Sequence, residues 1–176
     1  SPGAPNVAVY VNGAKATADL AFGVAAPNDG TYLKLPSGTA NVAIRAAGSD
    51  PASTPVFSAD LTLPAQATVT AAARGQLSNS TFTVTPFVDD VTPTAGAARV
   101  TVVHVSPNTP AVDVYADAAN TAGAPAVTGL SFPNASGSLL VPAATYTFGV
   151  TVTGSKSVAL PVGPAALPAN SATVVY

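Results

Sequence analysis

The side chains best suited to catalysis lie close together in the second half of the chain. His104 is the one histidine in the sequence, and Ser106 and Asp113 follow it within a short stretch. Serine, histidine and aspartate are the side chains of a nucleophilic hydrolase triad. The Ser-Pro step after His104 is typical of a turn, however. We therefore expect His104 to end a strand and hydrogen-bond that turn, and we assign no catalytic residue and expect no enzyme activity.

Four aspartates could supply the oxygen ligands that Ca²⁺ takes in proteins. They are Asp89, Asp90, Asp113 and Asp117. Their spacing does not match the calcium-loop pattern D-x-[DN]-x-[DN]-G, and the stretch "APNDG" at 26–30 is typical of a turn. We expect neither a metal site nor a cofactor.

Two short motifs fit the acceptor pattern for N-glycosylation. They are "NST" at Asn79 and "NAS" at Asn134. Both lie where turns are expected, so a glycan has room there if the source cell modifies its secreted proteins.

Two tyrosines are candidates for a sugar-binding platform. Tyr10 and Tyr115 occupy equivalent places, and each follows a valine in an alternating strand pattern. If the valine face is core, the tyrosines face solvent or an interface, but a place at the edge of the core is the interpretation we favour. Together with His104 they are the candidate ligand-binding or interface residues.

The composition excludes several classes of partner. Charged residues make up 8% of the 176 residues, against about 25% in an ordinary soluble domain. No basic stripe is present to neutralise phosphates, so we expect no nucleic-acid partner. No apolar run approaches the roughly 20 residues of a membrane-spanning helix, so we expect no membrane span.

The pattern of the chain predicts strands and little or no helix. Seventeen Pro and fourteen Gly interrupt it throughout, and the stretches between them are short and β-branched. "NVAVYV" alternates with Val7, Val9 and Val11 on one face. "AQATVTAAARGQ" is rich in Ala, which favours helix, but its Val and Thr alternate, so we predict a strand there too. The fold expected is all-β, with two tandem antiparallel β-sandwich (Ig-like) domains.

An internal repeat defines the domain organisation. "SPGAPNVAVYVNG" at 1–13 matches "SPNTPAVDVYADA" at 106–118. "GTYLKLPSGTANVAIRAAGS" matches "GSLLVPAATYTFGVTVTGS", and "LTLPAQATVTA" matches "AALPANSATVVY". We predict a first domain at 1–90, a linker at 91–97 and a second domain at 98–176.

The repeated signature resembles that of a secreted β-domain family, the domain of unknown function numbered four-three-nine-seven. The matching residues are His104, Ser106, Pro107, Pro110, Val112, Asp113, Val114 and Tyr115. The departures are Asn108, Thr109 and Ala118, and in the first copy Ala8 stands in place of the aspartate. The resemblance implies extracytoplasmic, often tandem, sandwich-like domains. It implies no established activity, so it transfers no catalytic residues.

The two copies differ at opposite ends. The second copy begins with "ARVTVVHV", for which the first has no counterpart, and the first ends with "STFTVTPFVDD", for which the second has none. Each domain is therefore predicted to lack one strand. The alternatives are missing terminal residues, a fragment of a longer tandem array, or a strand supplied by a neighbouring subunit.

From these features we expect a secreted structural or cell-surface protein. Its copies would pair through edge strands, and a heterologous contact that does not close would give an extracellular filament. The alternative is an extracellular module that binds a glycan or another ligand of the cell envelope through Tyr10 and Tyr115.

Overall fold

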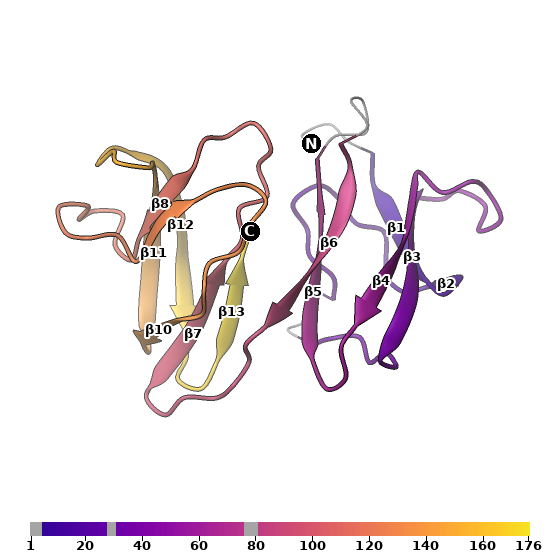
Figure 1. Ribbon diagram of the computed structural model, residues 1–176, viewed down its shortest axis with the longest axis horizontal. Coiled ribbons are helices and arrows are strands. Elements are labelled where there is room, and N and C mark those ends of the chain that lie inside the picture. The colour runs from indigo at the N-terminus through magenta and orange to yellow at the C-terminus, as the bar shows by residue number, and fades with distance from the viewer. Residues whose placement is uncertain (1–4, 28–30, 76–80) are drawn as a thin grey trace. The chain divides into compact units, whose positions relative to one another are not determined.

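The computed structural model describes residues 5–27, 31–75 and 81–176, and it confirms the all-β class (Figure 1). Strands account for 51% of the chain, and the described residues contain no helix. The chain divides into two compact units, unit 1 at Ser1–Val88 and unit 2 at Asp89–Tyr176. In the described ranges, no helix is long and apolar enough to cross a membrane.

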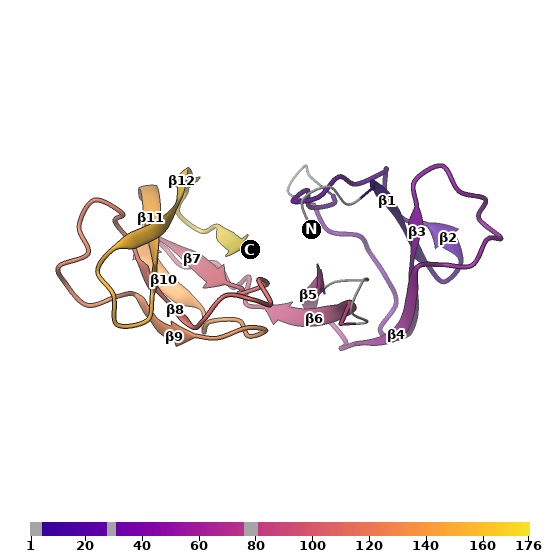
Figure 2. The same cartoon turned by 90° about the horizontal axis from the view of Figure 1, so that it is seen from above.

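Unit 1 contains a four-stranded sheet and a pair of strands. Its strands are β1 (Val7–Val11), β2 (Ala14–Lys15), β3 (Gly38–Ala46), β4 (Phe57–Leu63), β5 (Thr68–Arg74) and β6 (Thr83–Asp89). The four-stranded sheet has the order β2-β1-β3-β4, and β5 pairs with β6. Figure 2 shows the β5–β6 pair in a layer separate from β1 and β3.

Unit 2 contains two sheets of similar size. Its strands are β7 (Ala97–Val102), β8 (Val112–Tyr115), β9 (Val127–Leu130), β10 (Leu139–Pro142), β11 (Ala144–Val152), β12 (Val158–Leu167) and β13 (Ala172–Val175). One sheet has the order β12-β11-β8-β9 and the other β10-β7-β13. In the second sheet β7 is central, antiparallel to β10 and parallel to β13.

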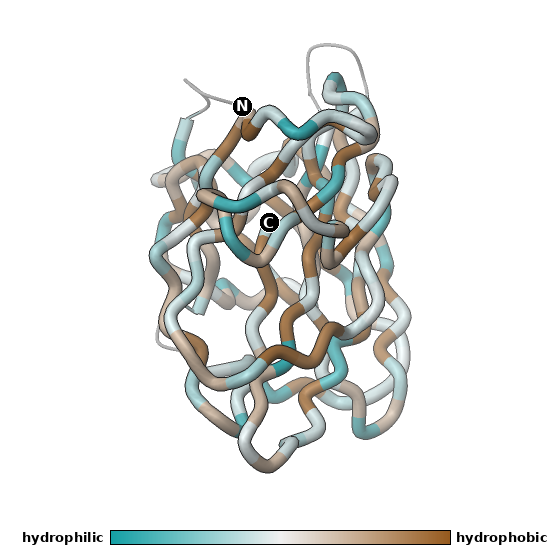
Figure 3. Tube along the Cα trace, turned by 90° about the vertical axis from the view of Figure 1, so that its left-hand side faces the viewer, coloured by the Kyte–Doolittle hydropathy of each residue, from teal (hydrophilic) through white to brown (hydrophobic). Residues whose placement is uncertain are grey.

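Each unit has its own apolar core, as the alternation of apolar and polar residues predicts. Figure 3 colours the chain trace by hydropathy and shows apolar residues interspersed with polar ones. The core of unit 1 consists of Val42, Ile44, Leu61 and Val84, with Val7, Val9 and Val11 packed against it. The core of unit 2 consists of Ala98, Val100, Val114, Val141, Phe148 and Leu167. The prediction of one valine face for "NVAVYV" is therefore confirmed.

The same turn leads into β5 in unit 1 and into β13 in unit 2. Each begins with Leu-Pro-Ala and ends on a residue with positive φ, Gln66 at 56° and Asn170 at 62°. An amide side chain tolerates this left-handed backbone better than a β-branched one. The turn aligns β5 with β13, and it confirms that the alanine-rich stretch after Gln66 forms a strand.

The segment predicted as a linker is held against unit 2. Arg99 forms an ion pair with Asp90 at 2.7 Å, and its Nε donates to the carbonyl of Thr92 at 2.7 Å. The predicted linker range also ends on Ala97, which is the first residue of β7. Residues 91–97 thus belong to unit 2 rather than forming a separate linker between the units.

Candidate functional site

His104 is buried and holds the turn that follows it. Its Nδ1 accepts a hydrogen bond from the backbone N–H of Ser106 at 3.3 Å. Because Nδ1 accepts, Nε2 carries the proton and donates to the carbonyl of Pro110 at 3.3 Å. The Ser106 hydroxyl pairs with the Thr109 hydroxyl at 2.6 Å instead of with the imidazole. The serine and histidine are therefore not arranged as nucleophile and base.

Asp113 is bonded to strand β9 and to the turn after β11, and not to His104. Its Oδ1 accepts from the N–H of Gly129 at 2.8 Å, and its Oδ2 accepts from the N–H of Gly154 at 3.0 Å. These bonds, that from Gly154 first, hold the pKa of the Asp113 carboxyl below its usual value. The three side chains considered for a triad thus have separate partners, and Asp113 joins β8 to β9 and to the turn after β11.

The aspartates considered for calcium do not gather at one place. Asp90 pairs with Arg99, and the Oδ1 of Asp117 accepts from the N–H of Ala119 at 2.8 Å. Within the described ranges, no group of three or more acidic, histidine or cysteine side chains could hold a metal ion.

Of the two sequons, Asn79 lies outside the described residues. Asn134 is exposed in the turn after β9, and its Nδ2 donates to the Ser131 hydroxyl at 3.1 Å. The hydroxyl of Ser136, the third residue of that sequon, accepts from the N–H of Val102 at 2.9 Å. Modification of either asparagine stays a prediction.

The two tyrosines are buried, as the favoured place at the edge of the core requires, and they form no exposed aromatic platform. Tyr10 is 6% exposed and Tyr115 is 3% exposed. The Arg45 guanidinium lies 5.4 Å from the centre of the Tyr10 ring, and the Lys156 Nζ lies 4.9 Å from the centre of the Tyr115 ring. Lys156 also donates to the Tyr115 hydroxyl at 2.9 Å. A cation covers each ring, so neither offers its face to a sugar.

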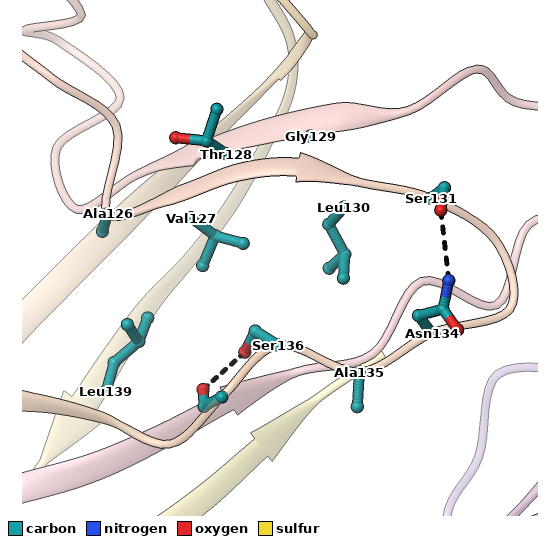
Figure 4. A pocket seen from close by; sticks show the side chains of 11 residues that line it. Ala126, Val127, Thr128, Gly129, Leu130, Ser131, Asn134, Ala135, Ser136 and Leu139 are labelled. Atoms are coloured by element: carbon teal, nitrogen blue, oxygen red, sulfur yellow. Dashed lines mark hydrogen bonds between the residues drawn. The ribbon is translucent and has the colours of Figure 1, made fainter.

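A cavity of about 390 Å³ opens between β9 and β10 in unit 2. Figure 4 shows Val127, Leu130 and Leu139 around it, with Asn134 and Ser131 joined by a hydrogen bond at one end. Its lining residues include no titratable side chain. The cavity therefore offers apolar contact and a few hydroxyl and amide groups, but no acid or base.

The two units also differ in the strands that pair with β5 and with its counterpart β13. In unit 2, β13 pairs with β7, and β7 pairs with β10. In unit 1, β5 corresponds to β13, but within the described residues its only strand partner is β6. Residues 31–37, which correspond to the β10 region, form no strand. Unit 1 thus pairs β5 with the strand that follows it, whereas unit 2 pairs β13 with its first strand.

Two leucines in the segment that precedes β3 are exposed. Pro36 precedes β3 as Pro142 precedes β11, so Leu33 and Leu35 correspond to Leu139 and Val141. Leu33 is 44% exposed and Leu35 is 43% exposed, whereas Val141 is 9% exposed. Sequence reasoning did not identify the two leucines as site residues, although the match of "YLKLP" with "SLLVP" contains the signal.

The comparisons with known proteins identify a family but no individual relative. The family model described as a domain of unknown function, DUF4397, matches residues 1–115 and again residues 98–176. No curated protein and no solved structure matches the chain.

Proposed function

Because the chain belongs to the family of the domain of unknown function DUF4397, as two tandem copies, we propose a role based on its own sheets. The protein is a secreted structural or cell-surface protein whose copies pair through strand edges into an extracellular filament. The signature shared with that family motivates the extracellular location, and the low charge suits close packing of copies.

One observation carries the proposal. The equivalent strands β5 and β13 each have one strand partner in the described residues, β6 and β7, so each has one edge without a strand partner there. An open edge presents a row of backbone donors and acceptors that another chain can pair with. Leu33 and Leu35 add exposed apolar surface in the segment before β3.

A second open edge gives the contact a direction. β13 is the last strand of the order β10-β7-β13, so its far edge is also without a strand in the described residues. The edges of β5 and β13 belong to different units and are not the same surface. Contacts between unlike surfaces that do not close into a ring produce an open chain of subunits.

Sedimentation of the purified chain over a series of concentrations, with electron microscopy of the same samples, tests the proposal. We expect elongated assemblies that grow with concentration. The variant Leu33→Asp, which places a charge in the exposed apolar segment before β3, is expected to reduce assembly. Leu140→Asp, at a leucine that is also exposed but lies on β10, is the matched control and is expected to assemble normally. A monomer at every concentration would overturn the proposal.

Antibody labelling of intact source cells tests the location separately. We expect labelling without permeabilisation. Labelling only after the cells are opened would contradict a place on the cell surface.

A further inference from the structure

We infer that two copies of the chain form a two-fold dimer, in which the free edges of their β4 strands pair side by side in an antiparallel ladder. The four-stranded sheets of the two copies of unit 1 then continue into one sheet. This contact goes beyond the proposed function, because the filament contacts use the edges of β5 and β13 and the dimer uses neither.

The direction of the backbone groups in β4 follows from the strand beside it. Asn41 of β3 bonds on the β1 side, since its carbonyl accepts from the N–H of Asn12 at 2.8 Å and its N–H donates to the Asn12 side chain at 2.9 Å. Asn41 lies opposite Asp60 of β4. In an antiparallel ladder both residues of such a pair point their backbone groups away from each other, so Asp60 points away from β3. The same holds two residues to either side, at Ser58 and Thr62.

The outer edge of β4 is free in the part of the chain that the structure describes. There β4 is the last strand of the order β2-β1-β3-β4, and no backbone hydrogen bond from another segment reaches its outer side. The side chains of Ser58, Asp60 and Thr62 are exposed, and the ladder with β3 has no register shift. A regular edge with unpaired donors and acceptors is a template for another strand.

Unit 2 protects the equivalent edge. In β12, the counterpart of β4, Pro161 lies opposite Gly149, as Ser58 lies opposite Ala43 in unit 1, and each pair is next to the buried tyrosine of its unit. The position of Pro161 therefore faces outward, where proline has no N–H to offer. Pro164 and a register shift follow along β12. Prolines and bulges keep sheet edges from pairing, and β4 contains neither.

The residues of β4 select the register of the dimer. Axes at Ala59, Asp60 and Leu61 are those that pair at least two of the three outward residues. An axis at Asp60 sets its two carboxylates directly opposite each other, which is unfavourable. An axis at Leu61 sets Ser58 opposite Pro64, which has no N–H to donate. The axis at Ala59 avoids both.

In this register the edge of β4 is complementary to itself, as a two-fold contact requires. Ser58 of each copy exchanges N–H and C=O bonds with Asp60 of the other, and its hydroxyl lies beside that carboxylate. On the inward face Ala59 meets Ala59, and Phe57 meets Leu61. Apolar residues thus face apolar residues, and the serine faces the aspartate.

The variant Ser58→Pro, which copies the proline of β12, tests the contact. Because the Ser58 N–H faces away from β3, the variant loses no bond of the ladder within the chain and should keep the circular dichroism of the parent chain. We expect Leu33→Asp, in which filament growth is reduced, to sediment as a dimer. Adding Ser58→Pro should raise the dissociation constant of that dimer by at least about tenfold.

Ser58→Ala in the same background is the matched control. It removes the hydroxyl but keeps the N–H, so we expect the dissociation constant to rise by no more than about threefold. A dimer that persists equally in Ser58→Pro, or a Leu33→Asp chain that is monomeric at every concentration, would overturn the inference.

A single cysteine reports the register, because the chain contains none of its own. Ala59→Cys sets two thiols opposite each other at a pair whose side chains are close. Diamide, which takes up the two thiol hydrogens, should join the copies through a disulfide. Thr62→Cys is the control, since its two copies lie roughly 20 Å apart, beyond the reach of a disulfide. Equal cross-linking of both variants, or none of Ala59→Cys, would contradict the contact.

The outcomes separate this contact from the filament. If the parent chain forms filaments and Leu33→Asp gives dimers that Ser58→Pro dissociates, both stand. If the parent chain forms filaments but Leu33→Asp sediments as a monomer, the filament stands and the β4 contact is wrong. If the parent chain stops at two copies and Ser58→Pro is a monomer, the β4 contact stands and the filament is wrong.

Discussion

The two units place different residues at the same point of the four-stranded sheet. In unit 2 Asp113 lies opposite Thr151, and in unit 1 Ala8 lies opposite Arg45. The aspartate of unit 2 bonds to strand β9 and to the turn after β11, whereas the arginine of unit 1 covers the Tyr10 ring. In unit 2 a lysine from the loop after β11 covers the equivalent ring. Both units therefore bury the tyrosine beneath a cation. The cation comes from different places, however: Arg45 on β3 in unit 1 and Lys156 in the loop after β11 in unit 2.

The units differ more in their other sheets, which are β5-β6 in unit 1 and β10-β7-β13 in unit 2. Unit 2 places β7 at the centre of its three-stranded sheet, and Ala98 and Val100 of that strand complete its core. In the described part of unit 1, β6 supplies Val84 to the core. The second sheets thus contribute to the two cores through strands from different places in the chain, the first strand of unit 2 and the last strand of unit 1.

We expect the largest change in the free energy of unfolding from substitution of the leucines that begin the two equivalent turns. Leu167 is 2% exposed and belongs to the core of unit 2, whereas Leu63 in unit 1 is only half-buried. Leu167→Ala should lower the free energy of unfolding by about 3 kcal/mol, since it leaves a cavity in a closed core. Leu63→Ala should lower it by less than half as much. Urea unfolding followed by circular dichroism measures both, and equal losses would mean that the two cores are equally complete.

A smaller effect follows from Asp113, which has no acidic counterpart in unit 1. Its pKa is lowered in the folded protein by the N–H groups of Gly154 and Gly129, so the unfolded chain binds a proton more readily. The stabilisation is complete above about pH 4 and is lost as the pH falls through the lowered pKa. In Asp113→Asn this part of the acid dependence should disappear. Thermal unfolding of both proteins in acidic buffers checks it, and identical pH profiles would contradict it.

The smallest effect concerns the cation over the buried ring. Tyr115→Phe removes the hydroxyl that accepts from Lys156 but keeps the ring beneath the ammonium group. We expect a loss of about 1 kcal/mol or less, because the bond is partly exposed to water. Thermal unfolding measures it. A loss as large as that of Leu167→Ala would show that the hydroxyl, rather than the ring, anchors this side of unit 2.

The local features of the fold were predictable from the sequence. The alternation of Val7, Val9 and Val11 predicts one inward face, and each Leu-Pro-Ala turn predicts a strand on either side of it. These features depend on neighbouring residues, so the sequence contains them directly. The same holds for His104, where a Ser-Pro step next to the ring indicated a turn.

Contacts between distant residues were not predictable. The alternation places Tyr115 on the face opposite the valines, but it does not show that Lys156, far along the chain, covers that face. Nor does it show that Asp113 bonds to Gly129 and Gly154, or that β7 and β13 run parallel. Each depends on how loops and strands meet in space.

The parallel pairing of β7 with β13 also has a mechanical consequence. The two strands are the first and last of unit 2, and their outer ends point in opposite directions along the ladder. A pulling force that enters at the start of β7 and leaves at the end of β13 therefore loads the bonds between the strands in shear. All of them must break together, rather than one after another from an end. A fibre built from such units would resist tension through this ladder.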